Sequence, residues 1–222
     1  MGGRMEIIMI RIAPSVLACD FSHLADEIRE IEKAGADMLH LDVMDGIFVP
    51  NISFGFPVIE SLRDKSALPF DVHLMIAAPE RYLERFIAAG ADSITFHYEA
   101  CEDIPVALDT VRLLGKRVAI SVKPDTPIEV VYPYLDRCDM ILVMTVEPGY
   151  GGQALIPSTI EKIRALRAEI DRRGLSVKIQ ADGGINAATA GEVIAAGADI
   201  LVAGSAVFHA KDRRAAMDAL RG

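Results

Sequence analysis

Two histidines and two aspartates stand where short apolar segments alternate with polar residues. His40 and Asp42 fall on one face of their segment, because successive side chains of a strand point to opposite sides. His73 takes the same kind of position in a second segment, and Asp182 ends a third. Buried carboxylates are costly unless they are paired or coordinated, and two imidazoles with two carboxylates suit a divalent cation. The pattern therefore predicts one metal site formed by these four side chains.

Each of the four side chains also has a more ordinary interpretation when taken alone. A single histidine is commonly a hydrogen-bonded core residue, and a single aspartate commonly belongs to a turn or a helix cap. Four such residues at matching strand ends favour a metal ligand set over four unrelated roles. The set suits zinc, iron(II), manganese or cobalt, and the residue types alone do not choose among these ions.

Glycine-containing segments follow the sixth, seventh and eighth apolar segments of the chain. They span residues 147–153, 182–184 and 203–205. Glycine lets backbone N–H groups approach an anion closely, and the loops after the last strands of an α/β barrel often hold phosphate. One such loop would most simply make a turn. Three at the same end of a barrel predict a phosphate site, which would explain how an acidic protein binds an anion.

The tetrapeptide Ala-Gly-Ala-Asp occurs three times, at residues 34–37, 89–92 and 196–199. Each copy follows an amphipathic segment and precedes an apolar one, so its glycine is expected to end a helix in the left-handed conformation. The three glycines are 55 and 107 residues apart. If an interval of roughly 54 residues holds two strand–helix units, the chain accommodates about eight units.

Eight short apolar segments have the length and composition of strands. They span residues 10–17, 38–43, 70–75, 93–97, 117–122, 140–146, 176–181 and 200–203. Helical patterns lie between them, with starts marked by Pro79, Pro127, Pro157 and Asn186. Alternation of strand and helix predicts an α/β fold with a parallel sheet, and eight units predict a single (β/α)8 TIM barrel. An open doubly wound sheet is the alternative.

Composition places the chain among soluble globular proteins of one domain, 1–222, with residues 1–6 as a loose leader. The 51% of hydrophobic residues and 25% of charged residues leave no long apolar segment for a membrane. The net charge of −9 argues against a nucleic-acid partner, which would call for a basic patch. Three widely spaced cysteines suggest neither a disulfide framework nor a Cys-x-x-Cys site, so we expect a cytoplasmic location.

Six motifs together resemble the ribulose-phosphate 3-epimerase family. They are Ala-Pro-Ser-Val-Leu-Ala at 13–18, Leu-Asp-Val-Met-Asp-Gly at 41–46, Phe-Val-Pro-Asn at 48–51, Asp-Val-His-Leu-Met at 71–75, Met-Thr-Val-Glu-Pro-Gly-Tyr-Gly-Gly-Gln at 144–153 and Asp-Gly-Gly at 182–184. The resemblance runs in the family's order from about residue 12 to the C-terminus. It implies a ribulose-phosphate-binding barrel, a homo-oligomer (dimer or hexamer), that epimerises D-ribulose 5-phosphate and D-xylulose 5-phosphate at C3 in the pentose phosphate pathway.

The resemblance also implies roles for individual residues. It makes His40, Asp42, His73 and Asp182 the metal ligands, and Asp42 and Asp182 the catalytic acid and base on opposite faces of the substrate. Ser15 and His73 would contact the sugar. Further contacts to sugar or phosphate would come from Gly149, Tyr150, Gly151, Gly152, Asp182, Gly183, Gly184, Gly204 and Ser205. Met44, Met75 and Met144 would form a hydrophobic shield against water, although simple core filling also explains them.

The implied chemistry matches this equipment. Removal of the proton next to a ketone leaves an enediolate, whose negative oxygen a cation stabilises. Inversion at that carbon needs a base on one face and an acid on the other, and two carboxylates supply both. One of them is expected to be charged and the other protonated at the start of a turnover.

Two departures from the family pattern affect substrate choice more than reaction type. Ile47 stands where the family usually has histidine and could alter sugar contacts. Gln180 and Ala181 stand where it usually has Glu-Val, which removes a charge near Asp182. An allulose-6-phosphate 3-epimerase or another ketose-phosphate 3-epimerase is therefore an alternative, and a non-catalytic phosphosugar-binding barrel is a second. His97 points inward on its strand, as a hydrogen-bonded core residue or as a support for the site, and we favour the former.

Overall fold

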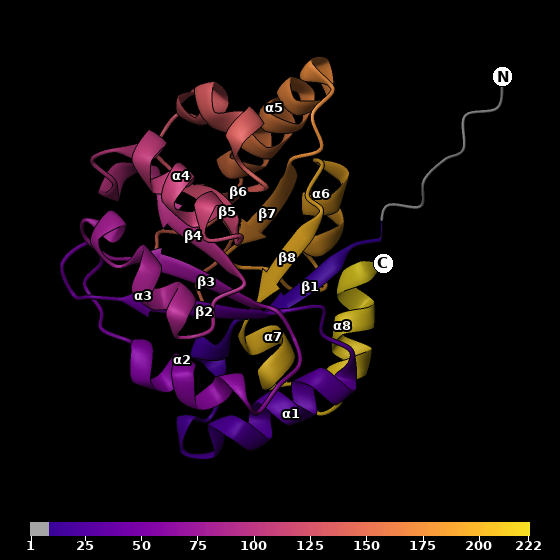
Figure 1. Ribbon diagram of the computed structural model, residues 1–222. Coiled ribbons are helices and arrows are strands. Elements are labelled where there is room, and N and C mark those ends of the chain that lie inside the picture. The colour runs from indigo at the N-terminus through magenta and orange to yellow at the C-terminus, as the bar shows by residue number, and fades with distance from the viewer. Residues whose placement is uncertain (1–8) are drawn as a thin grey trace, which may run out of the picture.

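Eight parallel strands form one nearly closed barrel in the computed structural model, which describes residues 9–222 (Figure 1). The strands are β1 Arg11–Pro14, β2 Leu39–Met44, β3 Phe70–Met75, β4 Ser93–His97, β5 Arg117–Val122, β6 Met140–Met144, β7 Lys178–Asp182 and β8 Ile200–Ala203. They pair in the order β1-β8-β7-β6-β5-β4-β3-β2. A parallel bridge between Ser15 and His40 joins the last two, β1 and β2. The TIM barrel is confirmed, and the open doubly wound sheet is excluded.

Helices surround the ring of strands (Figure 1). The α-helices are α1 Leu24–Ala34, α2 Phe56–Arg63, α3 Leu83–Ala88, α4 Ile104–Leu113, α5 Ser158–Arg173, α6 Ala190–Ala195, α7 Ser205–Phe208 and α8 Arg213–Arg221. The 3₁₀ segments are η1 Val16–Ala18, η2 Phe21–His23, η3 Pro79–Arg81, η4 Tyr98–Ala100 and η5 Ile128–Arg137. Between β5 and β6 only η5 occurs, and Pro133 within it has no N–H for an α-helical hydrogen bond. Within residues 9–222, no helix is both long and apolar enough to cross a membrane.

Strand bounds agree with the sequence pattern to within two residues, except at the end of the first strand. The bounds of β3, β4, β5 and β8 match the prediction residue for residue. The segment 10–17 was predicted as one strand, but β1 ends at Pro14 and the chain turns into η1, where Val16 is buried. Burial thus extends beyond the strand, and hydrophobicity alone does not mark its end. The predicted leader, residues 1–6, lies outside the described residues.

The core has an outer and an inner part. Outward-facing side chains of the strands pack against the helices in one large apolar cluster. Inside the barrel, a separate small apolar cluster forms the floor, comprising Ala13, Met38, Ala119, Met140, Ile200 and Val202. Polar side chains, among them His40, Asp71 and Gln180, are fully buried within the ring. These polar groups lie within the ring, between the apolar cluster and the C-terminal mouth of the barrel, where active sites form in this fold.

Four aspartates repeat one contact at the N-terminal ends of the strands. Each aspartate donates its backbone N–H to the carbonyl of one residue in the preceding strand and accepts that residue's N–H with its carboxylate. The pairs are Asp37 with Ile12, Asp92 with Phe70, Asp139 with Val118, and Asp199 with Ile179, with all eight distances between 2.8 and 3.0 Å. Each pair joins an even-numbered strand to the odd-numbered strand before it, so the barrel consists of four two-strand units.

Three of these aspartates end the Ala-Gly-Ala-Asp repeats. The glycines have φ values of 96°, 120° and 115°, which confirms the predicted left-handed helix stop. A Cβ on Gly90 or Gly197 would lie 2.8 or 2.7 Å from the side chain of Arg63 or Arg167, respectively. The Arg167 side chain forms an ion pair with Asp199, with 2.5 Å between Nη2 and Oδ2. In these two repeats the glycine thus ends the helix and leaves room for an arginine side chain that pairs with the aspartate of the same repeat.

We expect Asp199→Asn to lower the free energy of unfolding by about 1.5–3 kcal/mol, the usual range for hydrogen bonds to a charged group. Asp199 is buried and accepts hydrogen bonds from Ile179, Arg167 and Lys178. The NH₂ group of an asparagine would face one or more of these donors without an acceptor. Asp139→Asn is the matched control, because the exposed Asp139 carboxylate accepts only the Val118 N–H among the described contacts. Urea unfolding of both variants measures the difference. An equal or larger loss in Asp139→Asn would contradict the assignment.

Candidate active site

The four predicted metal ligands come together at the C-terminal ends of β2, β3 and β7. Asp42 Oδ1 lies 3.3 Å from His40 Nε2 and 3.1 Å from His73 Nδ1. Asp182 Oδ2 lies 3.7 Å from each of the same two nitrogens, and the nitrogens are 3.3 Å apart. One ligand atom from each residue lies within 4.8 Å of all the others. The strand period places these side chains inside the ring, and the pairing of β2 with β3 sets Asp42 beside His73.

These spacings suit a four-coordinate cation. With metal–ligand bonds of about 2.0–2.1 Å, the corners of a tetrahedron lie about 3.3–3.4 Å apart. Five of the six edges between the four ligand atoms measure 3.1–3.7 Å. Both histidines are fully buried, and Asp42 is nearly so. The donor set therefore matches zinc, iron(II), manganese or cobalt in number, charge and spacing.

A buried carboxylate orients His40. His40 Nδ1 lies 2.9 Å from Asp71 Oδ2, so the proton on that nitrogen is donated to Asp71 and Nε2 faces the ligand cluster. Gln180 Nε2 donates to the same oxygen at 2.9 Å, and Ser93 Oγ donates to the other at 2.8 Å. Burial by itself would raise the pKa of Asp71, but these hydrogen bonds and His40 outweigh it and lower the pKa. Asp71 is thus held as an ionised acceptor.

Gln180 therefore has a different part from the one that the sequence suggested. It is fully buried and reaches across the barrel to Asp71, which stands 109 residues away in the chain. A glutamate at this position would place a second carboxylate against Asp71, whereas the amide supplies a donor. The departure changes the support of His40 and leaves the four predicted ligands in place.

His73 has a buried partner on its other ring nitrogen. His73 Nε2 lies 2.9 Å from His97 Nε2, and His97 Nδ1 lies 3.3 Å from Glu99 Oε2. Burial lowers the pKa of His97 to about 4, which keeps this imidazole neutral at physiological pH. The favoured interpretation of His97, a hydrogen-bonded core residue, describes its burial but misses that its partner is a predicted metal ligand.

The two predicted catalytic carboxylates have pKa values that are shifted in opposite directions. Burial alone would raise the pKa of Asp42, but His40 and His73 outweigh it and hold the pKa far below its usual value. Burial and the negative charge of Asp42 raise the pKa of Asp182 to about 6. Asp42 is therefore charged at neutral pH, while Asp182 is the carboxyl that more readily holds a proton.

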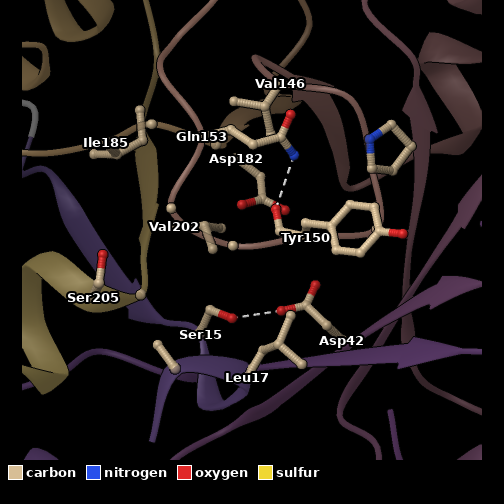
Figure 2. Close-up of a pocket in the computed structure, with 18 of the residues that line it drawn as sticks. Ser15, Leu17, Asp42, Val146, Tyr150, Gln153, Asp182, Ile185, Val202 and Ser205 are labelled. Carbon is tan, nitrogen blue, oxygen red and sulfur yellow. Dashed lines mark hydrogen bonds between the residues drawn. The ribbon is translucent and has the colours of Figure 1, made fainter. Parts of the chain in front are cut away.

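A cavity of about 590 Å³ opens above this cluster. Figure 2 shows Asp42 and Asp182 reaching it from different strands, with Ser15 donating to Asp42 Oδ2 at 2.5 Å. Every residue predicted to contact the substrate lines this cavity except His73, which lies behind Asp42. Met44, Met75 and Met144 also line it, and all three are almost fully buried. The cavity thus joins the carboxylates to the glycine loops.

Glycine is required in the loop after β7. Gly183 and Gly184 have φ values of 120° and 66°. A Cβ on Gly183 would lie 2.4 Å from the Val146 side chain, and one on Gly184 would lie 2.4 Å from the Leu155 backbone nitrogen. Within residues 9–222, neither lysine nor arginine lines the cavity. A phosphate held here would depend on backbone N–H groups and on hydroxyls such as that of Ser205.

Some residues of the site were not predicted from the sequence. Asn186 and His209 line the cavity, and His209 Nε2 lies 3.1 Å from the Ala18 carbonyl. Asp71 was on the inward face of its strand, which was the one available signal for its role. Ile47 is 79% exposed and does not line the cavity, and an effect of this residue on sugar contacts stays a prediction.

Comparisons with known proteins show which family this chain resembles. The model of the Ribulose-phosphate 3 epimerase family matches residues 11–208. A ribulose-phosphate 3-epimerase of Bacillus subtilis is 45% identical over 96% of this chain and 99% of its own. One of Mycobacterium bovis is 50% identical over 95% and 91%, and one of Escherichia coli is 42% identical over 95% and 94%.

Solved structures with the same fold are more distant in sequence. KGPDC from Streptococcus mutans has a TM-score of 0.68 at 13% identity, covering 96% of this chain and 95% of its own. Orotidine 5'-phosphate decarboxylase from Pyrococcus horikoshii has a TM-score of 0.67 at 17% identity, covering 95% and 97%. At these identities the likeness extends to the barrel alone. The family match and the close relatives go further: this chain belongs to the ribulose-phosphate 3-epimerase family.

Proposed function

We propose that the protein is a metal-dependent enzyme that interconverts D-ribulose 5-phosphate and D-xylulose 5-phosphate at C3, as a step of the pentose phosphate pathway. One observation carries this proposal: four donor atoms at tetrahedral spacing lie below a cavity that ends in glycine loops. The two carboxylates among the four donors have pKa values displaced in opposite directions. Opposite protonation is what proton transfer across a stereocentre requires.

Asp42 and Asp182 exchange the substrate proton. Asp42, charged at neutral pH, accepts the proton from C3 in one direction, and Asp182 delivers a proton to the opposite face. The roles reverse in the other direction. A divalent cation held by His40, Asp42, His73 and Asp182 supplies, when bound, Lewis-acid stabilisation of the negative charge that develops on the substrate. Ser15, which donates to Asp42, fixes the carboxylate and presents its oxygen to the sugar.

Three methionines limit access of water to the reacting carbon. Met44 and Met75 pack with Val49, Leu17 and Phe48, and Met144 packs in a second small cluster beside β6. All three line the cavity near the carboxylates. A charged intermediate is protected from premature protonation where an apolar wall excludes solvent. These side chains therefore act as a shield as well as filling the mouth of the barrel.

Two other functions remain possible outcomes of an assay. An allulose-6-phosphate 3-epimerase would share the fold and the carboxylates, and the ratio of kcat/KM for five-carbon and six-carbon ketose phosphates separates it from the proposed enzyme. A non-catalytic phosphosugar-binding barrel would bind phosphate without exchanging the C3 hydrogen. Homo-oligomerisation as a dimer or hexamer stays a prediction, and so does the cytoplasmic location, which the three free cysteine thiols support.

Asp182→Asn is expected to lower kcat about 10²–10⁴-fold, because one of the two acid–base groups is lost. Turnover of D-ribulose 5-phosphate and deuterium uptake at C3 in D₂O are the measurements. Asp139→Asn is the control, since Asp139 is an exposed aspartate at the opposite end of the barrel. Removal of metal with a chelator should abolish turnover, and an added divalent ion should restore it. Wild-type turnover in the variant or in metal-free protein would reject the proposal.

Metal binding is expected to weaken as the pH falls from 7 to 5, and more steeply below about 6. Asp42 and Asp71 outweigh burial and raise the pKa of His40 well above its ordinary value, so a proton must leave His40 over this whole interval. The pKa of Asp182 in the metal-free protein is raised to about 6, so below that pH a proton must leave before the carboxylate can coordinate. Each proton released weakens the apparent affinity by about tenfold per pH unit below its pKa. Competition with a chelator between pH 5 and 7, corrected for the chelator's own protonation, measures the effect. A flat profile over that interval would disagree with the raised pKa.

Gly184→Ala is expected to raise KM for the sugar phosphate and to weaken competitive inhibition by inorganic phosphate. The new Cβ would meet the Leu155 backbone at a φ of 66°, so the loop must shift and its N–H groups move away from the phosphate. Gly191→Ala is the control, because nothing lies within 4 Å of a Cβ at that helical position. Unchanged phosphate inhibition in a folded Gly184→Ala variant would exclude the loop after β7 as the phosphate site.

A further inference from the structure

A line of three side chains runs outward from the metal-ligand cluster: His73 and His97 are fully buried, and the Glu99 side chain is 21% exposed. His73 Nε2 meets His97 Nε2 at 2.9 Å, and His97 Nδ1 meets Glu99 Oε2 at 3.3 Å. Both rings are fully buried, and their centroids are 5.0 Å apart in a stacked arrangement. His97 and Glu99 belong to β4 and η4, neither of which supplies any of the four predicted metal ligands.

Glu99, at the outer end of the line, can only accept hydrogen bonds. Glu99 Oε1 accepts the Lys123 backbone N–H at 2.8 Å and also accepts the Thr126 hydroxyl. Burial opposes ionisation of Glu99, but the hydrogen bonds from His97, Thr126 and Lys123 outweigh it and lower the pKa to about 2. A carboxylate in this state has no proton to donate. The nitrogen of His97 that faces Glu99 must therefore carry the hydrogen.

The direction of donation then follows along the line. A neutral imidazole has one N–H and one bare nitrogen. With the hydrogen on His97 Nδ1, His97 Nε2 is bare and accepts from His73 Nε2. His73 Nδ1 is consequently bare as well, and it lies 3.1 Å from Asp42 Oδ1 and 3.3 Å from His40 Nε2. A bare imidazole nitrogen is the form that binds a metal.

We propose that His97 and Glu99 are positioning residues that set the tautomer of His73, so that Nδ1 of His73 faces the cation without a proton. The inference rests on the metal centre of the proposed function and extends it to two residues that touch neither metal nor substrate. Substitution of a residue that hydrogen-bonds to a metal ligand typically weakens metal affinity by 10–100-fold. Glu99 acts through His97, and His97 acts through His73.

The surroundings hold this line in place. The Phe48 ring packs on His97 with centroids 4.8 Å apart, and Lys123 Nζ lies 4.1 Å from the centre of the Phe48 ring. Lys162 of α5 donates to the carbonyl oxygens of Lys123, at 3.0 Å, of Pro124, and of Thr126, at 2.5 Å. The loop after β5 is therefore tied to α5 at the point where it holds Glu99. A rigid acceptor at the end of the line is what a fixed tautomer requires.

Glu99→Gln tests the proposal with almost no change in shape. Two donors point at the Oε1 position, so the amide oxygen of the glutamine should occupy it. The amide NH₂ then donates to His97 Nδ1, so the direction of hydrogen-bond donation reverses. His97 Nε2 carries the hydrogen and donates to His73 Nε2, and the hydrogen of His73 moves to Nδ1. We expect the variant to bind Zn²⁺ or Mn²⁺ about 10–100-fold more weakly than wild type. Thr126→Val is the matched control, because it removes one donor to Glu99 and keeps the carboxylate, so its affinity should stay near the wild-type value.

The ring ¹⁵N chemical shifts of labelled histidines report the tautomers directly in metal-free protein. We expect the hydrogen on His73 Nε2 and on His97 Nδ1 in wild type and in Thr126→Val, and the opposite arrangement in Glu99→Gln. Hydrogen on His73 Nδ1 of the wild type would overturn the inference, even if Glu99→Gln failed to fold. Unchanged tautomers and unchanged metal affinity in a folded Glu99→Gln variant would overturn it too.

These measurements separate the inference from the proposed function. If the tautomers are as expected but wild-type protein binds no divalent ion, the line of hydrogen bonds is real and the metal centre is wrong. If wild-type protein binds metal and epimerises ketose phosphates while His73 carries its hydrogen on Nδ1, the proposed function stands and the positioning role fails.

Discussion

Two carboxylates that can only accept hydrogen bonds, the buried Asp71 and the partly exposed Glu99, determine how the interior of the barrel is organised. Asp71 stands behind His40 and Glu99 stands behind His97, so the ring N–H groups of the line point outward toward them. His40 Nε2 and His73 Nδ1 are left facing each other at 3.3 Å, with Asp42 and Asp182 beside them. Two bare nitrogens and two carboxylates repel unless a positive charge lies between them. A proton can serve in the metal-free protein, since Asp42 and Asp71 raise the pKa of His40 against the effect of burial. The four side chains therefore form a group that could hold a cation.

The same region also closes the fold. β1 and β2 stand at the two ends of the strand order, and the bridge between Ser15 and His40 joins them. The hydrogen bond from Ser15 to Asp42 links the same two segments. At the opposite end of this seam, the Asp37 carboxylate accepts the Ile12 N–H. Changes that loosen the seam therefore disturb a predicted ligand, and changes to Asp42 remove a contact that helps to close the barrel. Catalytic geometry and barrel closure depend on overlapping contacts.

Much of the site followed from strand periodicity, because a period of two residues leaves little freedom. Once 39–44 and 70–75 were taken as strands, the inward positions of His40, Asp42 and His73 were determined, and the structure brings these side chains together. The contact of Gln180 with Asp71 could not be found in this way, since it crosses the barrel and depends on how far each side chain reaches. The direction of Ile47 could not be derived from periodicity either. It lies on a loop, which has no period, and the Asp45 carboxylate sets the direction of that loop by accepting the Ile47 and Phe48 N–H groups.

The protein's charge of −9, and the absence of lysine and arginine from the cavity among residues 9–222, constrain how it would hold an anionic substrate. Repulsion from distant surface carboxylates is weakened by salt over about 10 Å at 0.1 M, whereas N–H groups and hydroxyls act at contact distance. Val146 and Leu155 lie so close to Gly183 and Gly184 that they leave no room for a Cβ at either position. In the proposed enzyme, positive charge would be concentrated at the metal centre, where it would stabilise the negative charge that develops on the reacting carbons, and neutral dipoles would hold the phosphate. A lysine at the phosphate would add binding that is equal in the ground state and the transition state, which lowers KM without accelerating the proton transfer.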